Sequence, residues 1–336
     1  MAAVAVSSAA MAQVTVTGNL GFDVRSDTTK AGVKTSGNAV NTGAVRFTVA
    51  EDLGGGLKAS AFTEIAMRGR TATTGTSRDA ALTLSGGFGS ITAGAVEAGN
   101  GIVGLGQGGA PVIGMDGSVL DGGTNVDIIT YAFPALVPGL GLSVSTMDLT
   151  GANSQTGSIT QVAATFKVGG LSLAADHADY KKFADVAAEN GLMATVGNTA
   201  LAPITSSTTL AATNTVVRPY TKASYGVDSR SRVSVGYDLG VAKIGAGYQT
   251  KSYNTAGQRD NVQTVMGLSI PMGAITVGVV GATSKTDGAT TKTTGTEYGL
   301  SYALSKRTSI AVAAQSYKVT GEASTKANRV RLNHNF

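Results

Sequence analysis

Hydrophobic and polar residues alternate with a period of two along most of the chain. From Val14 to Arg25 the even positions hold Val, Val, Gly, Leu, Phe and Val, and the odd positions hold Thr, Thr, Asn, Gly, Asp and Arg. In a β-strand these two sets of side chains point to opposite faces. The segment therefore predicts a strand with one apolar face and one polar face.

Segments of about ten residues recur, each bounded by turn residues, and this length suits a strand that crosses a bilayer. We predict 16 strands, at residues 13–25, 43–51, 57–68, 78–86, 89–96, 126–134, 140–148, 158–168, 171–179, 229–238, 241–251, 261–270, 273–283, 295–304, 307–318 and 326–336. The number is even, as in single-chain bacterial barrels, and a barrel of this size has a water-filled lumen. The predicted fold is all-β, a 16-stranded antiparallel transmembrane β-barrel. A soluble all-β adhesin is the alternative, because half-buried strands alternate in the same way.

The connections between the predicted strands are of two kinds, which alternate. Short turns rich in Gly and Asp, such as 51–56, 86–89 and 238–240, permit tight reversals of the backbone. Between them lie long polar stretches, at 26–42, 69–77, 97–125, 149–157, 180–228, 252–260, 284–294 and 319–325. Short turns on one side and long loops on the other are typical of outer-membrane barrels. The stretch 180–228 is long for an ordinary connection and has room for a further hairpin.

Composition agrees with this architecture. Hydrophobic residues make up 42% of the 336 residues, but charged residues make up only 14%, against about 25% in ordinary soluble domains. No run of about 18 apolar residues follows the N-terminus, which excludes transmembrane helices. Cys is absent, so disulfides and thiolate metal sites are excluded. Trp is also absent, so the 10 Tyr and 8 Phe would have to form the aromatic girdles at the membrane interfaces.

The first 12 residues, MAAVAVSSAAMA, are small and apolar and precede Gln13. They end in an A-x-A cleavage signal, so we predict a signal peptide at 1–12 and the barrel at 13–336. No Lys or Arg precedes the apolar run. We therefore expect this signal peptide to be truncated, with the charged region missing. A buried N-terminal strand or helix is the alternative.

Five short motifs, taken in order, resemble the trimeric general porins of Gram-negative bacteria, especially the beta-proteobacterial branch. They are residues 13–18 (QVTVTG), 51–59 (EDLGGGLKA), 87–94 (GFGSITAG), 302–308 (YALSKRT) and the terminal Phe336. The resemblance implies an outer-membrane channel that forms a homotrimer, with its third long loop folded inward and Phe336 as its assembly signal. The implied partners are outer-membrane lipid, lipopolysaccharide, and the small solutes and ions that pass through the pore.

The resemblance also implies a constriction, where acids of the third loop, 97–125, face a ladder of arginines on the barrel wall. The predicted constriction comprises nine residues: Arg25, Arg46, Lys58, Glu64, Arg68, Arg78, Glu97, Asp116 and Asp121. Two segments depart from the family pattern. Residues 110–114 lack the usual acid, and residues 124–127 lack the arginine that often follows the loop.

Charged residues on the polar strand faces are predicted to point into the lumen, because an arginine that faces lipid at mid-depth costs about 2–4 kcal/mol. The inward basic residues would include Arg25, Lys167, Arg230, Arg232, Lys243, Arg329 and Arg331, and the inward acids Asp23, Glu64, Asp176, Asp238 and Glu297. Basic positions outnumber acidic ones, and the formal net charge is +5. Because a low-dielectric pore focuses such a field, we predict a modest preference for anions. The alternative is that these residues only solvate the wall and the loop sets selectivity.

The sequence gives little support for metal binding, catalysis or nucleic-acid binding. His177 and His334 have outward parity and no convergent partners that would ligate a metal. The Gly-rich run 99–109 lacks the Lys-Ser/Thr of a phosphate-binding loop, and no G-x-S-x-G motif accompanies a usable His. The basic residues are dispersed, which argues against nucleic-acid binding. We therefore predict a channel without enzymatic activity or cofactor. A substrate-specific channel, or a surface-exposed barrel that acts as an adhesin or structural protein, is the alternative.

Overall fold

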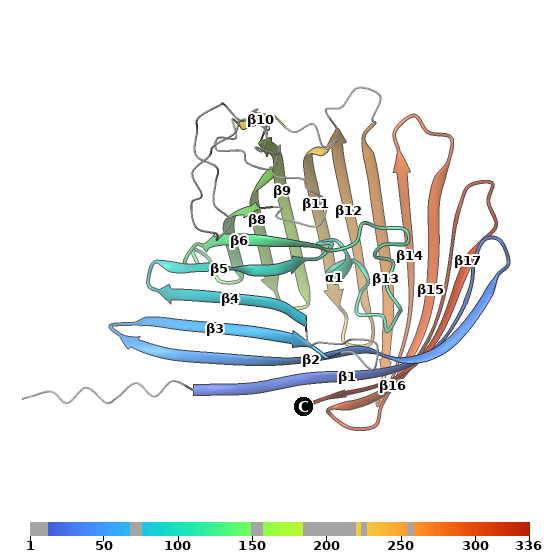
Figure 1. Ribbon diagram of the computed structural model, residues 1–336, viewed down its shortest axis with the longest axis horizontal. Helices are drawn as coiled ribbons and strands as arrows, with labels where there is room; N and C mark the ends of the chain where they lie inside the picture. Colours follow the sequence, from blue (N-terminus) through green and yellow to red (C-terminus); the bar gives the residue numbers. More distant parts are fainter. Residues whose placement is uncertain (1–12, 68–75, 149–156, 184–219, 223–226, 254–258) are drawn as a thin grey trace, which may run out of the picture.

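The computed structural model describes residues 13–67, 76–148, 157–183, 220–222, 227–253 and 259–336 (Figure 1). These residues form one antiparallel β-sheet that closes on itself, because β1 (Gln13–Thr28) pairs with both β2 (Lys34–Gly54) and β17 (Thr325–Asn335). Strands that follow one another in sequence pair around the ring. The predicted antiparallel β-barrel is therefore confirmed.

Within the described residues, sixteen long strands make up the ring, as the sequence predicts. Between β2 and β17 these are β3 (Leu57–Ala66), β4 (Thr76–Gly86), β5 (Gly89–Ala98), β6 (Thr124–Ala132), β7 (Leu140–Asp148), β8 (Gly157–Val168), β9 (Leu171–Phe183), β11 (Val227–Asp238), β12 (Lys243–Tyr253), β13 (Asn261–Met272), β14 (Ile275–Thr286), β15 (Lys292–Ala303) and β16 (Thr308–Val319). A short extra strand, β10 (Tyr220–Lys222), pairs with the end of β9. It belongs to the predicted loop 180–228, most of which lies outside the described residues.

Some of the predicted loops are shorter than expected. The prediction of a loop over 26–42 is wrong, because β1 and β2 stay paired as far as Thr28 and Lys34. In the same way, β14 and β15 stay paired into the predicted loop 284–294. Thr and Val favour the extended, paired backbone. The turns that connect these strand pairs are therefore only a few residues long. They lie around Gly32 and Gly288, whose φ angles of 80° and 63° suit glycine.

The two faces of the sheet differ as the alternation predicts. On β16, Ile310 and Val312 are exposed on the outer face, whereas Ala313 and Gln315 are buried on the inner face. Exposed apolar area is unfavourable in water by about 25 cal/mol per Å². A continuous outer surface of this kind is therefore stable where it faces lipid.

The closing seam of the barrel joins the two ends of the described chain. The backbone N–H of Gly18 donates to the Phe336 carbonyl at 2.8 Å, and the Phe336 N–H donates to the Gly18 carbonyl at 2.9 Å. A side chain at Gly18 would lie 2.5 Å from the Phe336 ring. The glycine therefore leaves the space that the terminal ring fills. Residues 1–12, the predicted signal peptide, lie outside the described residues, and that division of the chain stays a prediction.

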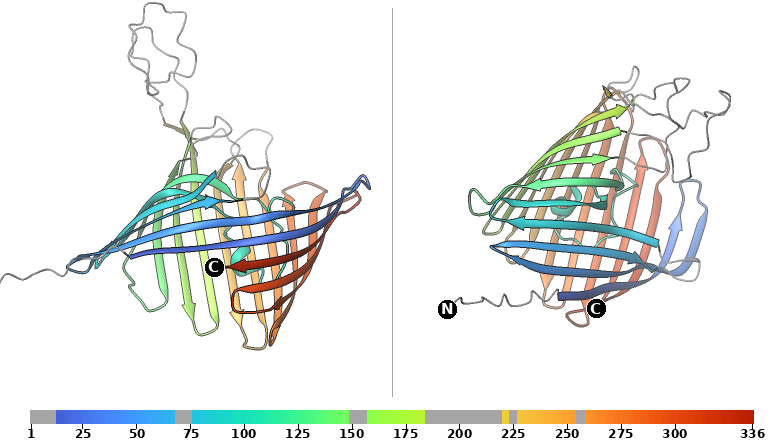
Figure 2. Two further views of the ribbon diagram at one scale, coloured as in Figure 1. Left: turned by 60° about the horizontal axis from the view of Figure 1, so that its bottom comes forward. Right: turned by 60° about the vertical axis from the view of Figure 1, so that its left-hand side comes forward.

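The short helix α1 (Val103–Gly106) lies inside the barrel, between β5 and the opposite wall (Figure 2). It belongs to the connection between β5 and β6, which is the third long loop. No helix of the described segments is long and apolar enough to cross a membrane.

Candidate pore constriction

The third loop, residues 99–123, rests on a row of glycines on the inner wall. A side chain at Gly245 would collide with the Leu105 carbonyl, and one at Gly267 would collide with the backbone of Gln107. Because glycine has no Cβ, the loop backbone lies directly against the strands. We call Gly245, Gly247, Gly267, Gly278 and Gly299 the glycine shelf; each would meet loop atoms if it carried a side chain.

Apolar contacts hold the same loop to the wall. The loop side chains Ile102, Met115, Val119 and Leu120 form a buried cluster with wall residues, among them Val265 on β13. Burial of each large side chain contributes about 1.5–3 kcal/mol. The loop is therefore packed like a core element and not merely tethered at its ends.

Polar contacts fix the middle of the loop. The Glu297 carboxylate, fully buried on β15, accepts the Gly114 N–H at 3.1 Å. Gln315 donates to the Gly114 carbonyl at 2.7 Å, and Arg329 donates to the Val112 carbonyl at 2.9 Å. These three side chains come from the adjacent strands β15, β16 and β17. They satisfy loop backbone groups that water would otherwise solvate.

A second polar anchor holds the end of the loop. The Asp121 carboxylate lies 2.8 Å from the Lys251 ammonium and accepts hydrogen bonds from Gln249 at 2.7 Å and Gln263 at 3.0 Å. Lys251 and Gln249 belong to β12, and Gln263 to β13. These wall residues are absent from the predicted constriction, although Gln249 and Lys251 have the inward parity of Lys243 on the same strand.

Four charged side chains form a cluster on the wall between β2 and β5. Both guanidinium groups of Arg46 and Arg78 contact Glu64, at 3.0 and 3.1 Å, and Arg78 also lies 3.7 Å from Glu97. We call these four residues the wall cluster. Arg46 also stacks on the Phe62 ring, 4.2 Å from its centroid. The structure thus brings together four of the nine residues predicted from the sequence.

A family profile described as Gram-negative porin matches residues 1–322. The chain belongs to the Gram-negative porin family. The porin is therefore a β-barrel channel protein of the outer membrane. A comparison with curated proteins gives no match.

Solved structures share the fold of this porin. The anion-selective porin from Comamonas acidovorans is 19% identical and superposes with a TM-score of 0.69 over 97% of this chain and all (100%) of that one. The outer membrane channel DcaP of Acinetobacter baumannii is 13% identical, with a TM-score of 0.68 over 97% of each chain. The trimer form of OmpT, an outer membrane protein of Vibrio cholerae, is 11% identical, with a TM-score of 0.65 over 97% of this chain and 99% of that one.

A β-bulge aims Arg78 of the porin into the lumen. In β4 the large side chain of Leu82 faces outward, and strict alternation would turn Arg78 to the same side. The pairing with β3 shifts between Thr63 and Ile65, which puts one extra residue into β4. A bulge reverses the parity of the strand beyond it. Arg78 therefore reaches Glu64, which lies on the inner face of β3.

Arg25 and Lys58, which also belong to the predicted constriction of the porin, lie apart from the wall cluster. Arg25 pairs with Asp27 at 2.8 Å, near the tip of the β1–β2 hairpin. Lys58 lies opposite Asp52 beside the β2–β3 turn, about 20 Å along the strand from Glu64. Arg68 falls outside the described residues. Arg25 and Lys58 therefore form no part of the wall cluster, and their place in the constriction stays a prediction.

Two loop carboxylates of the porin differ in acidity. Burial raises the pKa of Asp121, but the Lys251 ammonium and hydrogen bonds from Gln263 and Gln249 outweigh burial and hold it below its ordinary value. Asp116 is exposed to lumen water and has neighbours of like charge. Partial enclosure by the protein, together with the Glu97 and Asp121 carboxylates, raises the pKa of Asp116 to about 6.

A further arginine pair stands on the opposite wall of the porin. Arg232 contacts the Asp176 carboxylate at 2.8 Å, and Arg230 lies 3.9 Å from the same group. The Arg230 guanidinium also lies over the Tyr180 ring, 5.7 Å from its centroid. The inward parity predicted for Arg230, Arg232 and Asp176 agrees with the register of β9 and β11.

Proposed function

We propose that the porin is a passive diffusion channel for small hydrophilic solutes and ions, with a modest preference for anions. One observation carries the preference. Arg46 and Arg78 are 39% and 40% exposed, whereas the Glu64 carboxylate between them is only 11% exposed. A permeating ion therefore meets two exposed guanidinium groups beside the shielded Glu64, and the Glu97 carboxylate, which is 46% exposed, offsets one of them. The third loop and the wall cluster together form the constriction.

The pairing of other charges makes the preference modest. Asp23 pairs with Arg331 at 2.7 Å, and Asp121 pairs with Lys251 at 2.8 Å. Such pairs largely cancel at the distance of a permeating ion. The anion-selective porin from Comamonas acidovorans supports the sign of the preference, because it shares this fold.

The test is the reversal potential across a planar bilayer with asymmetric salt. We expect a moderate preference for chloride over potassium in the native channel. The double variant R46Q/R78Q should lower that preference several-fold, because it removes two exposed positive charges. The variant E64Q should raise it, because both arginines lose their partner.

A matched control is R307Q, which removes one positive charge in the turn between β15 and β16, away from the wall cluster. It should leave the reversal potential unchanged. Equal reversal potentials in R46Q/R78Q, E64Q and the native channel would contradict the assignment of the constriction. A clear preference for cations in the native channel would overturn the proposed selectivity.

We include a homotrimer in the same proposal, on the strength of family membership. The trimer form of OmpT shares the fold of this chain. Conductance in the bilayer should then close in three equal steps, and the mass of the assembly in detergent should be three times 33.5 kDa. Single-step closure of a monomeric species would contradict a trimer.

A further inference from the structure

A hollow of about 600 Å³ lies inside the barrel, between the third loop and the short turns. Leu105 and Gly109 of the loop line one side of it, and residues at the β8–β9 and β11–β12 turns line the other. Binding sites for small molecules have volumes of this order. Because the short turns of outer-membrane barrels face the periplasm, the hollow lies on the periplasmic side of the third loop. We call it the lower hollow.

The register of the strands explains why the wall is hollowed at this point. Lys167 on β8 pairs with Ser172 on β9, which in turn pairs with Gly236 on β11. Residues directly opposite one another on neighbouring strands point to the same face, so these inward positions form one row across the wall. The side chains become smaller along the row, from lysine to serine to glycine. Space is therefore left above Ser172 and Gly236, where larger inward side chains would fill it.

The charges that line the lower hollow are not balanced. Lys167 is exposed and forms no ion pair with any other residue that the structure describes. Lys243 lies 3.1 Å from the Asp238 carboxylate, whose other oxygen accepts the Gly240 N–H at 2.9 Å. An ammonium group has three N–H donors, so the contact with Asp238 leaves the others of Lys243 free. Two ammonium groups and one carboxylate give the lower hollow one positive charge in excess.

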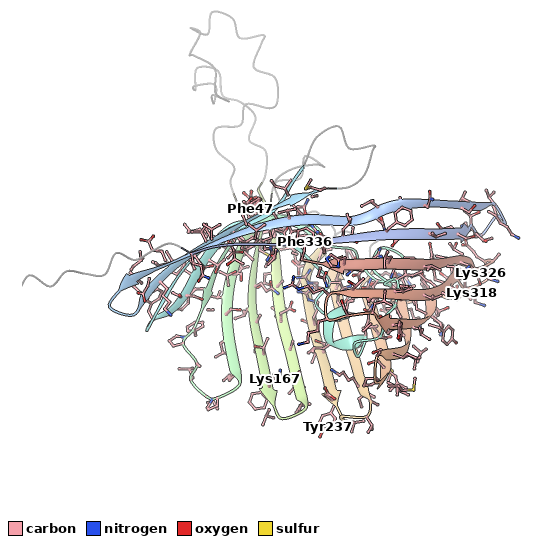
Figure 3. The ribbon with its side chains drawn as sticks, turned by 90° about the horizontal axis from the view of Figure 1, so that it is seen from below. Phe47, Lys167, Tyr237, Lys318, Lys326 and Phe336 are labelled. Carbon is pink, nitrogen blue, oxygen red and sulfur yellow. The ribbon has the colours of Figure 1, made fainter. Side chains whose placement is uncertain are left out.

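The two lysines stand at opposite sides of the lower hollow. Strands β9 and β11 separate β8 from β12, so the backbones of Lys167 and Lys243 are about 14 Å apart, which is three strand spacings. Figure 3 shows Lys167 at the short-turn end of the barrel, as is Tyr237, which also lines the lower hollow. A solute the size of a monosaccharide can therefore lie between the two ammonium groups.

We propose that the lower hollow binds hydroxylated monocarboxylates, the chemical class of sugar acids. The Lys167 ammonium donates to the carboxylate, and Ser172, Asp238 and Lys243 bind the hydroxyl groups. Net charge favours this class, because one excess positive charge matches one carboxylate, whereas a phosphate monoester carries about −1.5 to −2 charges. The Leu105 side chain offers an apolar surface to the C–H groups of the sugar. The inference rests on the proposed channel function but not on the proposed ion preference.

The direct test is block of the single-channel current by D-glucuronate, added to both sides of a planar bilayer that holds the full-length channel. Glucuronate should interrupt the current of the native channel, and D-glucose, which has no carboxylate, should not. K167Q should weaken the block about tenfold, because hydrogen bonds to charged groups contribute on this scale. K167R keeps the positive charge and should retain most of the block. The control K306Q removes a lysine in another short turn and should be blocked like the native channel.

A second variant tests the lower hollow without changing any charge. S172L fills its floor and should weaken the block by glucuronate, and it keeps the proposal testable if K167Q fails to fold. Heat-modifiable gel migration verifies that each variant has a folded barrel.

Two results would overturn the inference about the lower hollow. The first is equal block by glucuronate in K167Q, S172L and the native channel. The second is a block that R46Q/R78Q loses and K167Q retains, because the solute would then bind at the wall cluster. A channel that conducts salt but is not blocked by glucuronate contradicts this inference alone. A folded protein that forms no channel contradicts the proposed function instead.

Discussion

Asp116 and Asp121 lie five residues apart in the third loop, but their pKa values are shifted in opposite directions. Asp121 is held by Lys251 and keeps its charge below the ordinary Asp pKa of 3.8. Asp116 has no such cation among the described residues, and its pKa of about 6 lies close to neutrality. The ion pair of Asp121 with Lys251 therefore persists in mild acid, whereas Asp116 loses its negative charge.

This difference predicts a pH-dependent selectivity. Between pH 7.5 and pH 5, Asp116 takes up a proton, and the lumen loses one negative charge. Removal of a unit charge about 7 Å away changes the energy of each permeating ion by roughly 0.6 kcal/mol in water, with opposite signs for anion and cation. The anion-to-cation permeability ratio should therefore rise about sevenfold. Reversal potentials at the two pH values measure the change. D116N should have the higher ratio at both values, and an equally large pH response in D116N would refute the assignment.

Arg46 and Arg78 show what sequence alone can place at the scale of one residue. Arg46 lies on the inner face of β2, directly opposite Glu64 on β3. Alternation predicts this inward direction. The inward direction of Arg78 depends on a bulge in β4. No local sequence pattern predicts this bulge, and strict alternation from Leu82 would turn Arg78 outward. The Lys251–Asp121 pair joins residues 130 positions apart. A pairing of that kind depends on loop geometry, which strand periodicity does not determine.

At the scale of elements, the glycine shelf explains why the third loop lies flat against its wall. The glycines stand on the inner faces of β12 to β15, at positions where alternation requires only a small or polar side chain. Sequence composition shows that glycine is abundant, at 46 residues. It does not distinguish shelf glycines from those in turns, because the distinction lies in what packs against them.

The shelf predicts the effect of added bulk. G245V would push against Leu105 and Gly108, and overpacking of this kind costs about 1–3 kcal/mol. The loop should shift into the lumen, so single-channel conductance should fall and become noisier. G281V is the matched control, because a side chain there meets nothing within 4 Å. Native conductance in G245V would show that the shelf does not hold the loop.

At the scale of the whole molecule, the seam between β1 and β17 decides whether the sheet is a barrel. Alternation predicted both strands and their order, and the terminal Phe336 was expected to matter for assembly. The role of that residue as an assembly signal stays a prediction. The structure adds a reason for it, since its ring occupies space left by Gly18 and its backbone closes two hydrogen bonds.

The seam predicts a stability effect. G18A would place a methyl group against the Phe336 ring and the Ala44 carbonyl, which should destabilise the barrel by about 1–3 kcal/mol. The temperature of heat-modifiable gel migration should fall. G37A, on the same hairpin, is the control, because a methyl group there meets nothing within 4 Å. Equal transition temperatures in the two variants would contradict a tightly packed seam.

The same seam has a consequence for the order of folding. Gly18 and Phe336 are 318 positions apart in the sequence, so their pairing has a far larger loop-closure entropy than any hairpin of the ring. The fifteen local pairings can form first, and the closing one comes last. Until then β1 and β17 are both open edges, which are templates for pairing with other chains. Newly made chains therefore need protection against pairing with other chains at β1 and β17. A ligand that binds these two edges would delay closure and insertion of the barrel, but it would not bind the closed pore.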